Sequence, residues 1–208
     1  MIDNETDCLV IIDVQNDFCA GGALQVPDGD AVVGVINALG RRFSHRILTQ
    51  DWHPAGHDSF ASSHSGTSPY DVVRLAYGEQ ILWPDHCVQG SRGAAFHPAL
   101  EVEGAELMLR KGFRRAVDSY SAFFENDRTT PTGLSGYLRT RGFTRLFMAG
   151  LATDFCVAYS ALDGRAEGFD VMLIEDACRG IDIDDSVSKA WAQMTDAGVA
   201  RVSSADLD

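Results

Sequence analysis

The sequence predicts an α/β fold, a Rossmann-like three-layer α/β/α arrangement with a six-stranded parallel sheet. Two observations lead to this prediction. Six short apolar runs recur along the chain, and four of the segments between them have apolar residues at helical spacing. Strands that alternate with helices form a parallel sheet with helices on both faces. A chain of 208 residues is long enough for a sizeable core, and we expect a single domain over residues 1–208.

The first half of the chain contains three of the predicted strands. Residues 8–13 (CLVIID), 45–51 (HRILTQD) and 106–111 (ELMLRK) are each too short for a typical helix and are rich in large or β-branched apolar residues. Residues 29–43 form the predicted helix between the first two. The stretch from residue 51 to residue 105 is rich in Gly, Pro, Ser and His and has weak periodicity. We expect a long irregular loop there, and such loops in compact domains usually have a function.

The second half of the chain alternates more regularly. The remaining predicted strands are residues 145–150 (RLFMAG), 170–176 (DVMLIED) and 198–204 (GVARVSS). The remaining predicted helices are residues 133–143, 155–169 and 185–198. Each of these helical segments lies directly before or after a predicted strand, as in a parallel sheet with crossover helices.

Composition restricts the partners and the compartment. The formal charge of −13 argues against binding to nucleic acid or to an anionic membrane surface. Five widely spaced cysteines do not form a disulfide framework, and the acidic N-terminus lacks the features of a signal peptide. No apolar run approaches the ~20 residues that span a bilayer. We therefore expect a cytoplasmic protein. The sequence leaves open whether it forms a homo-oligomer.

Polar side chains stand where four predicted strands end. Asp13 ends the first strand, Asp51 the second and Lys111 the third. Cys156 follows the fourth strand after a short turn, in the first turn of a predicted helix. Because ligands of open α/β sheets bind at the carboxyl ends of the strands, we expect these side chains to meet at one functional edge.

These side chains have the complementary chemistry of a thiol nucleophile and its base. Free main-chain N–H groups at a helix start favour a thiolate, and those of Ala152 and Cys156 are candidate donors to an oxyanion. Asp13 is the candidate base, with Lys111 holding it in place. Two plainer interpretations stay open: Cys156 as a buried structural cysteine, and Asp13 with Lys111 as an ion pair at a strand end. Cys19 and Cys87 lie at no strand-to-helix turn and are interpreted as bystanders.

A second group of candidates lies beside the first. Asp51 and His53 are two residues apart at a strand end, so their side chains leave on the same face and can chelate a divalent metal. His86, in the segment WPDHCVQG, offers a third ligand. His57 is a further candidate, directly or through water, whereas His64 is more typical of a solvent-facing loop. Asp-x-His alone is a weak signal, and its position beside the candidate nucleophile strengthens it.

Several motifs resemble those of one family. The segments LVIIDVQNDFCAGGAL, TQDWHPAGHDSFASSH, LWPDHCVQGSRGAAFHP and GLATDFCVAYSALDG, with RKGF and DSYSAFF, are similar in sequence and order to nicotinamidases of the isochorismatase-like cysteine hydrolase superfamily. The resemblance runs from near Cys8 to about Asp184. The combination is specific, because other superfamily members share the sheet and the cysteine turn but are not expected to carry the metal residues.

The resemblance implies roles for individual residues. The catalytic triad would consist of three residues at strand ends: Asp13, Lys111 and Cys156. One divalent metal ion, zinc first with iron or manganese as alternatives, would be bound by Asp51, His53 and His86. A cis peptide would precede Ala152 or Thr153. The aromatic substrate slot maps onto four residues for which ordinary core packing is the alternative: Phe18, Leu24, Trp83 and Tyr120.

The expected reaction is hydrolysis of nicotinamide to nicotinate and ammonia, a step in NAD salvage, with pyrazinamide also accepted. Cys156 would form a thioester, Asp13 would move the protons, and the metal would orient the ring through its nitrogen. Two alternatives remain at this point. One is a metal-independent amidase of the same superfamily for a different small amide. The other is a non-catalytic metal-binding protein on the same fold.

Overall fold

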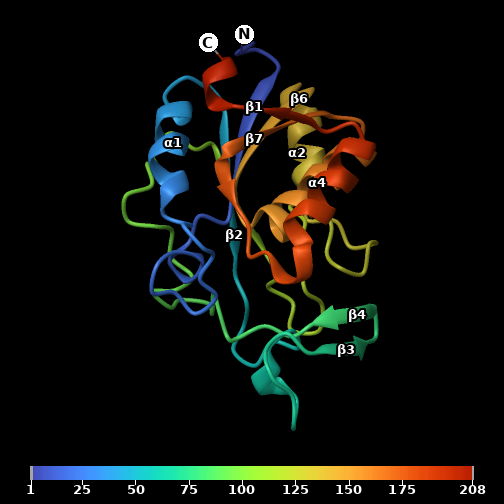
Figure 1. Ribbon diagram of the computed structural model, residues 1–208. Helices are drawn as coiled ribbons and strands as arrows, with labels where there is room; N and C mark the ends of the chain where they lie inside the picture. Colours follow the sequence, from blue (N-terminus) through green and yellow to red (C-terminus); the bar gives the residue numbers. More distant parts are fainter. Residues whose placement is uncertain (1, 208) are drawn as a thin grey trace.

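The computed structural model describes residues 2–207 and contains a main sheet of six parallel strands in the order β5-β2-β1-β6-β7-β8 (Figure 1). The strands are β1 (Asp7–Ile12), β2 (Arg46–Asp51), β5 (Leu107–Lys111), β6 (Arg145–Leu151), β7 (Asp170–Arg179) and β8 (Ala200–Val202). Each predicted strand coincides with one of these. The six-stranded parallel sheet is therefore confirmed.

Helices cover both faces of this sheet. They are α1 (Ala31–Gly40), α2 (Leu134–Arg141), α3 (Ala158–Ala166) and α4 (Ser186–Asp196). Alternate side chains of β1 enter two different cores: Leu9 and Ile11 pack in the cluster that includes α1, and Val10 and Ile12 in the cluster that includes the other three helices. Figure 1 shows α1 on one side of the sheet and α2 and α4 on the other. The result is the three-layer arrangement expected from the sequence.

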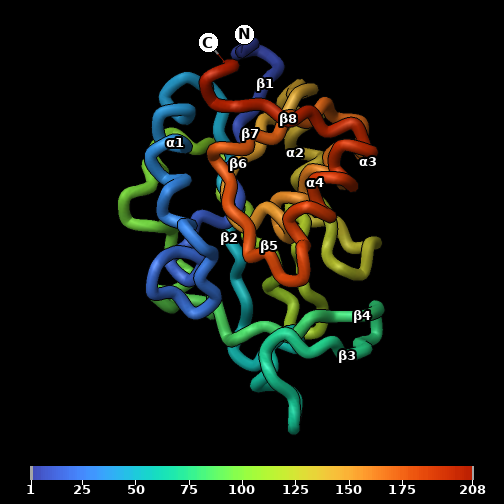
Figure 2. Tube along the Cα trace, viewed as in Figure 1, coloured from blue at the N-terminus to red at the C-terminus, as the bar shows by residue number. Residues whose placement is uncertain are grey.

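The stretch from residue 51 to residue 105 is not wholly irregular, and the expectation of a loop without regular structure is wrong in part. It contains an antiparallel hairpin of β3 (Val72–Leu75) and β4 (Gly78–Ile81), away from the main sheet in Figure 2. Its strands are short and β3 has no buried residue, so they lack the apolar alternation of a half-buried strand. The residues between the strands, Ala76 and Tyr77, also lack the Asn-Gly type of hairpin signal.

Two glycines let the functional edge of the sheet form. Gly150, near the end of β6, has a φ of +128°, and a Cβ there would lie 2.0 Å from the carbonyl oxygen of Ile12. Gly112, directly after β5, has a φ of +65°, and a Cβ there would lie 2.5 Å from the ring of His53. Neither position accepts a side chain, because the backbone conformation and the close neighbours both exclude one.

Among residues 2–207, no helix is long and apolar enough to cross a membrane.

Candidate active site

The Lys111 ammonium group stands at the centre of the site. Its Nζ lies 2.8 Å from Oδ2 of Asp13 and 2.6 Å from Oδ1 of Asp51. Sγ of Cys156 lies 3.3 Å from the same nitrogen, which also donates a hydrogen bond to the carbonyl of Ser119. Burial alone would lower the pKa of Lys111, but the two carboxylates raise it well above its ordinary value. The strand ends therefore meet as expected, around a permanent cation.

Asp13 follows β1 directly and is fully buried. Its φ is +47°, a left-handed value that non-glycine residues rarely adopt and that is often found at functional sites. The Thr49 hydroxyl donates a hydrogen bond of 2.6 Å to Oδ1 of Asp13 and accepts the Asp13 N–H at 3.1 Å. Burial raises the pKa of Asp13, although Lys111 and Thr49 oppose the shift. A carboxylate with a raised pKa is a better proton acceptor for a thiol.

Cys156 lies in the turn that joins β6 to α3. The chain enters this turn through a cis peptide between Leu151 and Ala152, the first of the two positions implied by the resemblance. The carbonyl of Ala152 then accepts hydrogen bonds from two N–H groups further along the turn, those of Phe155 and Val157. Burial raises the pKa of the Cys156 thiol well above its ordinary value, and Lys111 only partly offsets this. A base beside the sulfur is therefore needed to take the proton of the thiol.

The three candidate metal ligands converge on one point. Oδ2 of Asp51 lies 3.4 Å from Nε2 of His53 and 3.7 Å from Nε2 of His86. Nδ1 of His53 contacts the carbonyl of Gly112 at 2.9 Å, and Nδ1 of His86 contacts that of Pro84 at 2.8 Å. Because a carbonyl only accepts, each Nδ1 carries the proton and each Nε2 presents its lone pair. These buried residues fit a divalent metal ion.

His57 and His64 have other partners. Nε2 of His57 donates to the carbonyl of Arg114 at 2.9 Å, and its Nδ1 accepts the N–H of Ser59 at 3.1 Å. Both ring nitrogens of His57 are thus engaged, although the ring lies close to His53. His64 contacts the carbonyl of Asp58 through Nε2 at 2.8 Å. Neither histidine has a nitrogen directed at the Asp51 carboxylate.

A cavity opens onto Cys156. Its walls include all four residues of the slot implied by the resemblance, Phe18, Leu24, Trp83 and Tyr120. Asp51, His86 and Ala152 also line it. Among the cysteines of the described chain, Cys156 alone lines this cavity. A ring-shaped substrate would therefore lie between aromatic walls, with the thiol and the candidate metal ligands both within reach.

Three further lining residues were not found from the sequence: Asp118, Phe155 and Ile181. The Phe155 ring meets the Trp83 ring edge to face, with 4.9 Å between centroids. Oδ1 of Asp118 lies 4.0 Å from Nε2 of His53. Gln80 of the β3–β4 hairpin donates a hydrogen bond from its amide to Oδ2 of Asp118 at 2.9 Å. The hairpin therefore helps to fix the position of Asp118 in the cavity wall. The only signal for Asp118 was its place in the DSYSAFF motif.

Ile181 reaches the cavity through a loop that Asp154 holds. The buried Asp154 carboxylate accepts hydrogen bonds from the N–H groups of Ile181 and Asp182, at 3.0 and 2.8 Å, and from the Ser186 hydroxyl at 2.5 Å. Asp154 stands two residues before Cys156. Asp154 therefore links the turn that contains Cys156 to the loop that contributes Ile181 to the cavity wall.

The parallel sheet with helices on both faces, and the side chains gathered at its strand ends, define an amidohydrolase with a three-layer α/β/α fold. The chain belongs to the isochorismatase family, since the pattern of the isochorismatase domain matches residues 7–206. A nicotinamidase of Acinetobacter baylyi is 50% identical over 96% of this chain and 93% of its own length, and one of Escherichia coli is 46% identical over 96% of each. The family resemblance drawn from the motifs is confirmed.

Solved structures agree in fold and length. A nicotinamidase and pyrazinamidase of Acinetobacter baumanii has a TM-score of 0.97 at 50% identity, covering 98% of this chain and 99% of that one. A protein of L. infantum solved in complex with nicotinate has a TM-score of 0.86 at 41% identity, covering 98% and 96%. A pyrazinamidase of Pyrococcus horikoshii in complex with zinc has a TM-score of 0.77 at 33% identity, covering 95% and 98%.

Proposed function

We propose that this chain is a nicotinamidase that hydrolyses nicotinamide to nicotinate and ammonia through a thioester on Cys156, within a single domain. The observation that carries this proposal is the aromatic cavity that Cys156 lines together with Asp51 and His86. A planar ring with a carboxamide fits such walls, and the relatives at 50% and 46% identity are nicotinamidases. Pyrazinamide, a ring amide of similar shape, is expected to be accepted as well.

The triad supplies the proton transfers. Cys156 attacks the carboxamide carbon as its proton passes to Asp13, whose raised pKa suits it to receive a proton. Asp13 then protonates the departing nitrogen, and ammonia leaves a thioester. A water molecule that gives its proton to Asp13 hydrolyses the thioester, and Asp13 returns that proton to the Cys156 sulfur. Lys111, 2.8 Å from Asp13 and 3.3 Å from the sulfur, stabilises negative charge on each in turn.

The oxyanion needs donors on the side of the cavity opposite the base. The main-chain N–H groups of Ala152 and Cys156 are the proposed donors, and both residues line the cavity. One such donor is typically worth about 3 kcal/mol in acyl transfer. The tight turn fixes these groups before substrate arrives, so no reorganisation is needed during the reaction.

A divalent ion would be held by Asp51, His53 and His86, and we propose zinc, which the Pyrococcus horikoshii relative contains. Such an ion supplies an open coordination position that a ring nitrogen of the substrate can occupy. The histidine tautomers fixed by Gly112 and Pro84 already suit this role.

The five cysteines are unpaired, which supports the proposal of a reducing, cytoplasmic compartment.

The test is a steady-state assay of ammonia and nicotinate release from nicotinamide. Cys156→Ala should lower kcat by more than about 10³-fold, as expected for loss of a nucleophile. Cys178→Ala is the matched control, since Cys178 is also buried but does not line the cavity. Absence of turnover by the metal-loaded wild-type protein, or a Cys156→Ala variant with full activity, would refute the proposal.

A further inference from the structure

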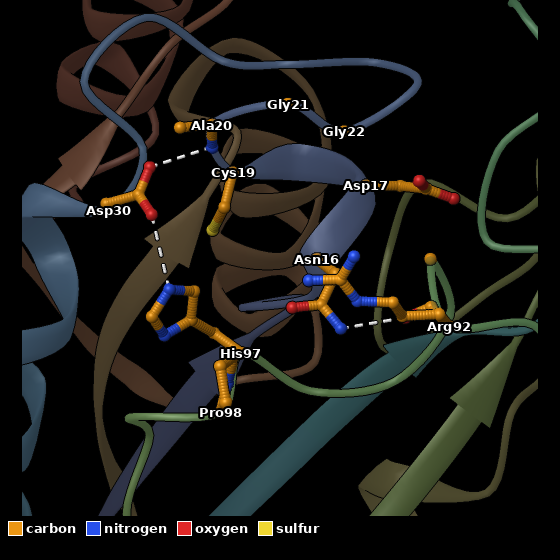
Figure 3. Close-up of a pocket in the computed structure, with 11 residues that line it drawn as sticks. Asn16, Asp17, Cys19, Ala20, Gly21, Gly22, Asp30, Arg92, His97 and Pro98 are labelled. Carbon is orange, nitrogen blue, oxygen red and sulfur yellow. Dashed lines mark hydrogen bonds and ion pairs between the residues drawn. The ribbon is translucent and has the colours of Figure 1, made fainter.

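Residues of one short segment, 16–30, line two different cavities. Phe18 and Leu24 line the substrate cavity. Their neighbours Asp17, Cys19 and Asp30 line a second cavity, together with Arg92 and His97 of a separate segment (Figure 3). Neither the triad nor the candidate catalytic metal ligands belong to this second cavity.

Three metal-ligating side chains meet there. Ligand atoms of Cys19, Asp30 and His97 all lie within 4.8 Å of one another. Nε2 of His97 is 3.2 Å from Oδ1 of Asp30, and Oδ2 of Asp30 is fixed by the Ala20 N–H at 2.8 Å. Figure 3 shows the Cys19 sulfur directed into the space between the Asp30 carboxylate and the His97 ring.

The Cys19 thiol is the unusual member of this group. Its side chain is 2% exposed, and within residues 2–207 its sulfur has no hydrogen-bond partner. Burial and the nearby Asp30 raise the pKa of Cys19 to about 11, so it is not a nucleophile at neutral pH. A buried thiol that is directed at a carboxylate and an imidazole, without a bond to either, is suited to a cation that displaces its proton.

We infer that Cys19, Asp30 and His97 form a second metal site, for a borderline divalent ion of the Zn²⁺ type. One sulfur, one nitrogen and one carboxylate oxygen, with water in the fourth position, make a donor set that such ions accept. Binding releases the thiol proton to solvent. It also moves the imidazole proton from Nε2 to Nδ1, at the loss of the 3.2 Å hydrogen bond that Nδ1 accepts from the Ala99 N–H.

The surroundings favour a cation that enters from solvent. Asp30 is exposed, so the site opens outward, while Cys19 lies at its buried end. The lining also contains Asp17 and Arg92, but the Asp17 carboxylate accepts the N–H groups of Ala23 and Cys87, so Asp30 is the carboxylate that faces His97. A bound ion would tie Cys19 and Asp30 to the separate segment that contains His97. It would therefore restrain the segment that carries Phe18 and Leu24.

The experiment is a Co²⁺ titration of the protein with its catalytic ion in place. The residues Asp51, His53 and His86 contain no thiolate, so a near-ultraviolet thiolate-to-Co²⁺ absorption band reports on a cysteine site alone. We expect this band in the wild-type protein, together with one additional bound ion per chain by elemental analysis. Cys156→Ala should keep the band, and Cys19→Ser should abolish it together with the additional ion.

Two further variants keep the test valid even if the Cys19→Ser variant does not fold. Asp30→Asn and His97→Gln each remove one ligand at a more accessible position and should weaken Co²⁺ binding at least about tenfold. Thermal unfolding of each variant without Co²⁺ shows whether it is folded. The proposal is overturned if the wild-type protein shows no band, if the band survives in Cys19→Ser, or if it disappears in Cys156→Ala. This outcome is separate from the amidase reaction, because nicotinamide turnover is not the readout.

Discussion

Asp51 and Lys111 form a buried ion pair, 2.6 Å between Oδ1 and Nζ, that joins the two halves of the candidate active site. The other oxygen of Asp51 faces the Nε2 atoms of His53 and His86. One carboxylate is therefore shared between the ammonium group of the candidate triad and the candidate metal site. Changes to Asp51 should disturb both halves, whereas changes to His86 should disturb only one.

Asp51→Asn and His86→Ala should therefore differ in a measurable way. Both should lower the metal content and kcat, the latter by two or more orders of magnitude if an orienting contact of about 3 kcal/mol is lost. Asp51→Asn should also lower the unfolding temperature more than His86→Ala in the metal-free proteins, because a charge-assisted hydrogen bond to Lys111 is weakened. Elemental analysis and thermal unfolding after chelation check this. An Asp51→Asn protein with a full complement of metal would contradict it.

Thr49 should act as a positioning residue for the base. Thr49→Val keeps the side-chain shape but removes the 2.6 Å hydrogen bond to Asp13 Oδ1 and the acceptor for the Asp13 N–H. We expect kcat to fall about tenfold or more, since hydrogen bonds to charged groups are worth about 1.5–3 kcal/mol. KM should change little, because Thr49 does not line the cavity. Thr49→Ser should restore kcat, and failure of this rescue would leave Thr49 with a packing role only.

The parts of the site that the sequence predicts are those tied to strand ends. Asp13, Asp51 and Lys111 end apolar runs, and the parallel topology that those runs imply places them side by side. Cys156 is found because a turn follows the fourth strand. The candidate metal ligands Asp51 and His53 are found from their spacing, and the cavity residues from the family motifs. Local pattern and topology suffice for the strand-end positions, whereas the cavity residues also need the family resemblance.

The remaining parts depend on contacts between distant segments. Thr49 has a hydroxyl in the middle of a buried strand, and nothing local shows that Asp13 lies beside it. Asp154 and Ile181 are 27 residues apart, and only the folded loop shows their hydrogen bond. The sequence leaves His57 as a candidate ligand because the spacing of residues does not show that its ring nitrogens bind Ser59 and Arg114. Burial raises the pKa of the Cys156 thiol more than Lys111 lowers it, a balance that the sequence does not contain.

Asp154 should control substrate binding through Ile181. An Asn side chain offers only one acceptor oxygen, so Asp154→Asn leaves at least one of three donors, the Ile181 and Asp182 N–H groups or the Ser186 hydroxyl, facing an amide NH₂ group. We expect KM for nicotinamide to rise about tenfold, as for one displaced apolar contact, with a smaller change in kcat. Ser186→Ala, which removes one donor without repulsion, should have a weaker effect. A fall in kcat at unchanged KM would instead place Asp154 in the chemistry of the Cys156 turn.

Discrimination between nicotinamide and benzamide tests whether a metal ion at the candidate site coordinates the ring nitrogen of the substrate. The two amides differ by one ring atom and have nearly the same shape, so the walls of Phe18, Leu24 and Trp83 alone would distinguish them weakly. An ion held by Asp51, His53 and His86 would lose its contact with the ring in benzamide, and water would take that position. We expect kcat/KM for nicotinamide to exceed that for benzamide by about 100-fold, equivalent to roughly 3 kcal/mol for one oriented contact. In His86→Ala the ratio should shrink toward one, because both substrates would then rely on the aromatic walls. Equal kcat/KM values for nicotinamide and benzamide in the metal-loaded wild-type protein would show that the metal ion does not coordinate the ring nitrogen.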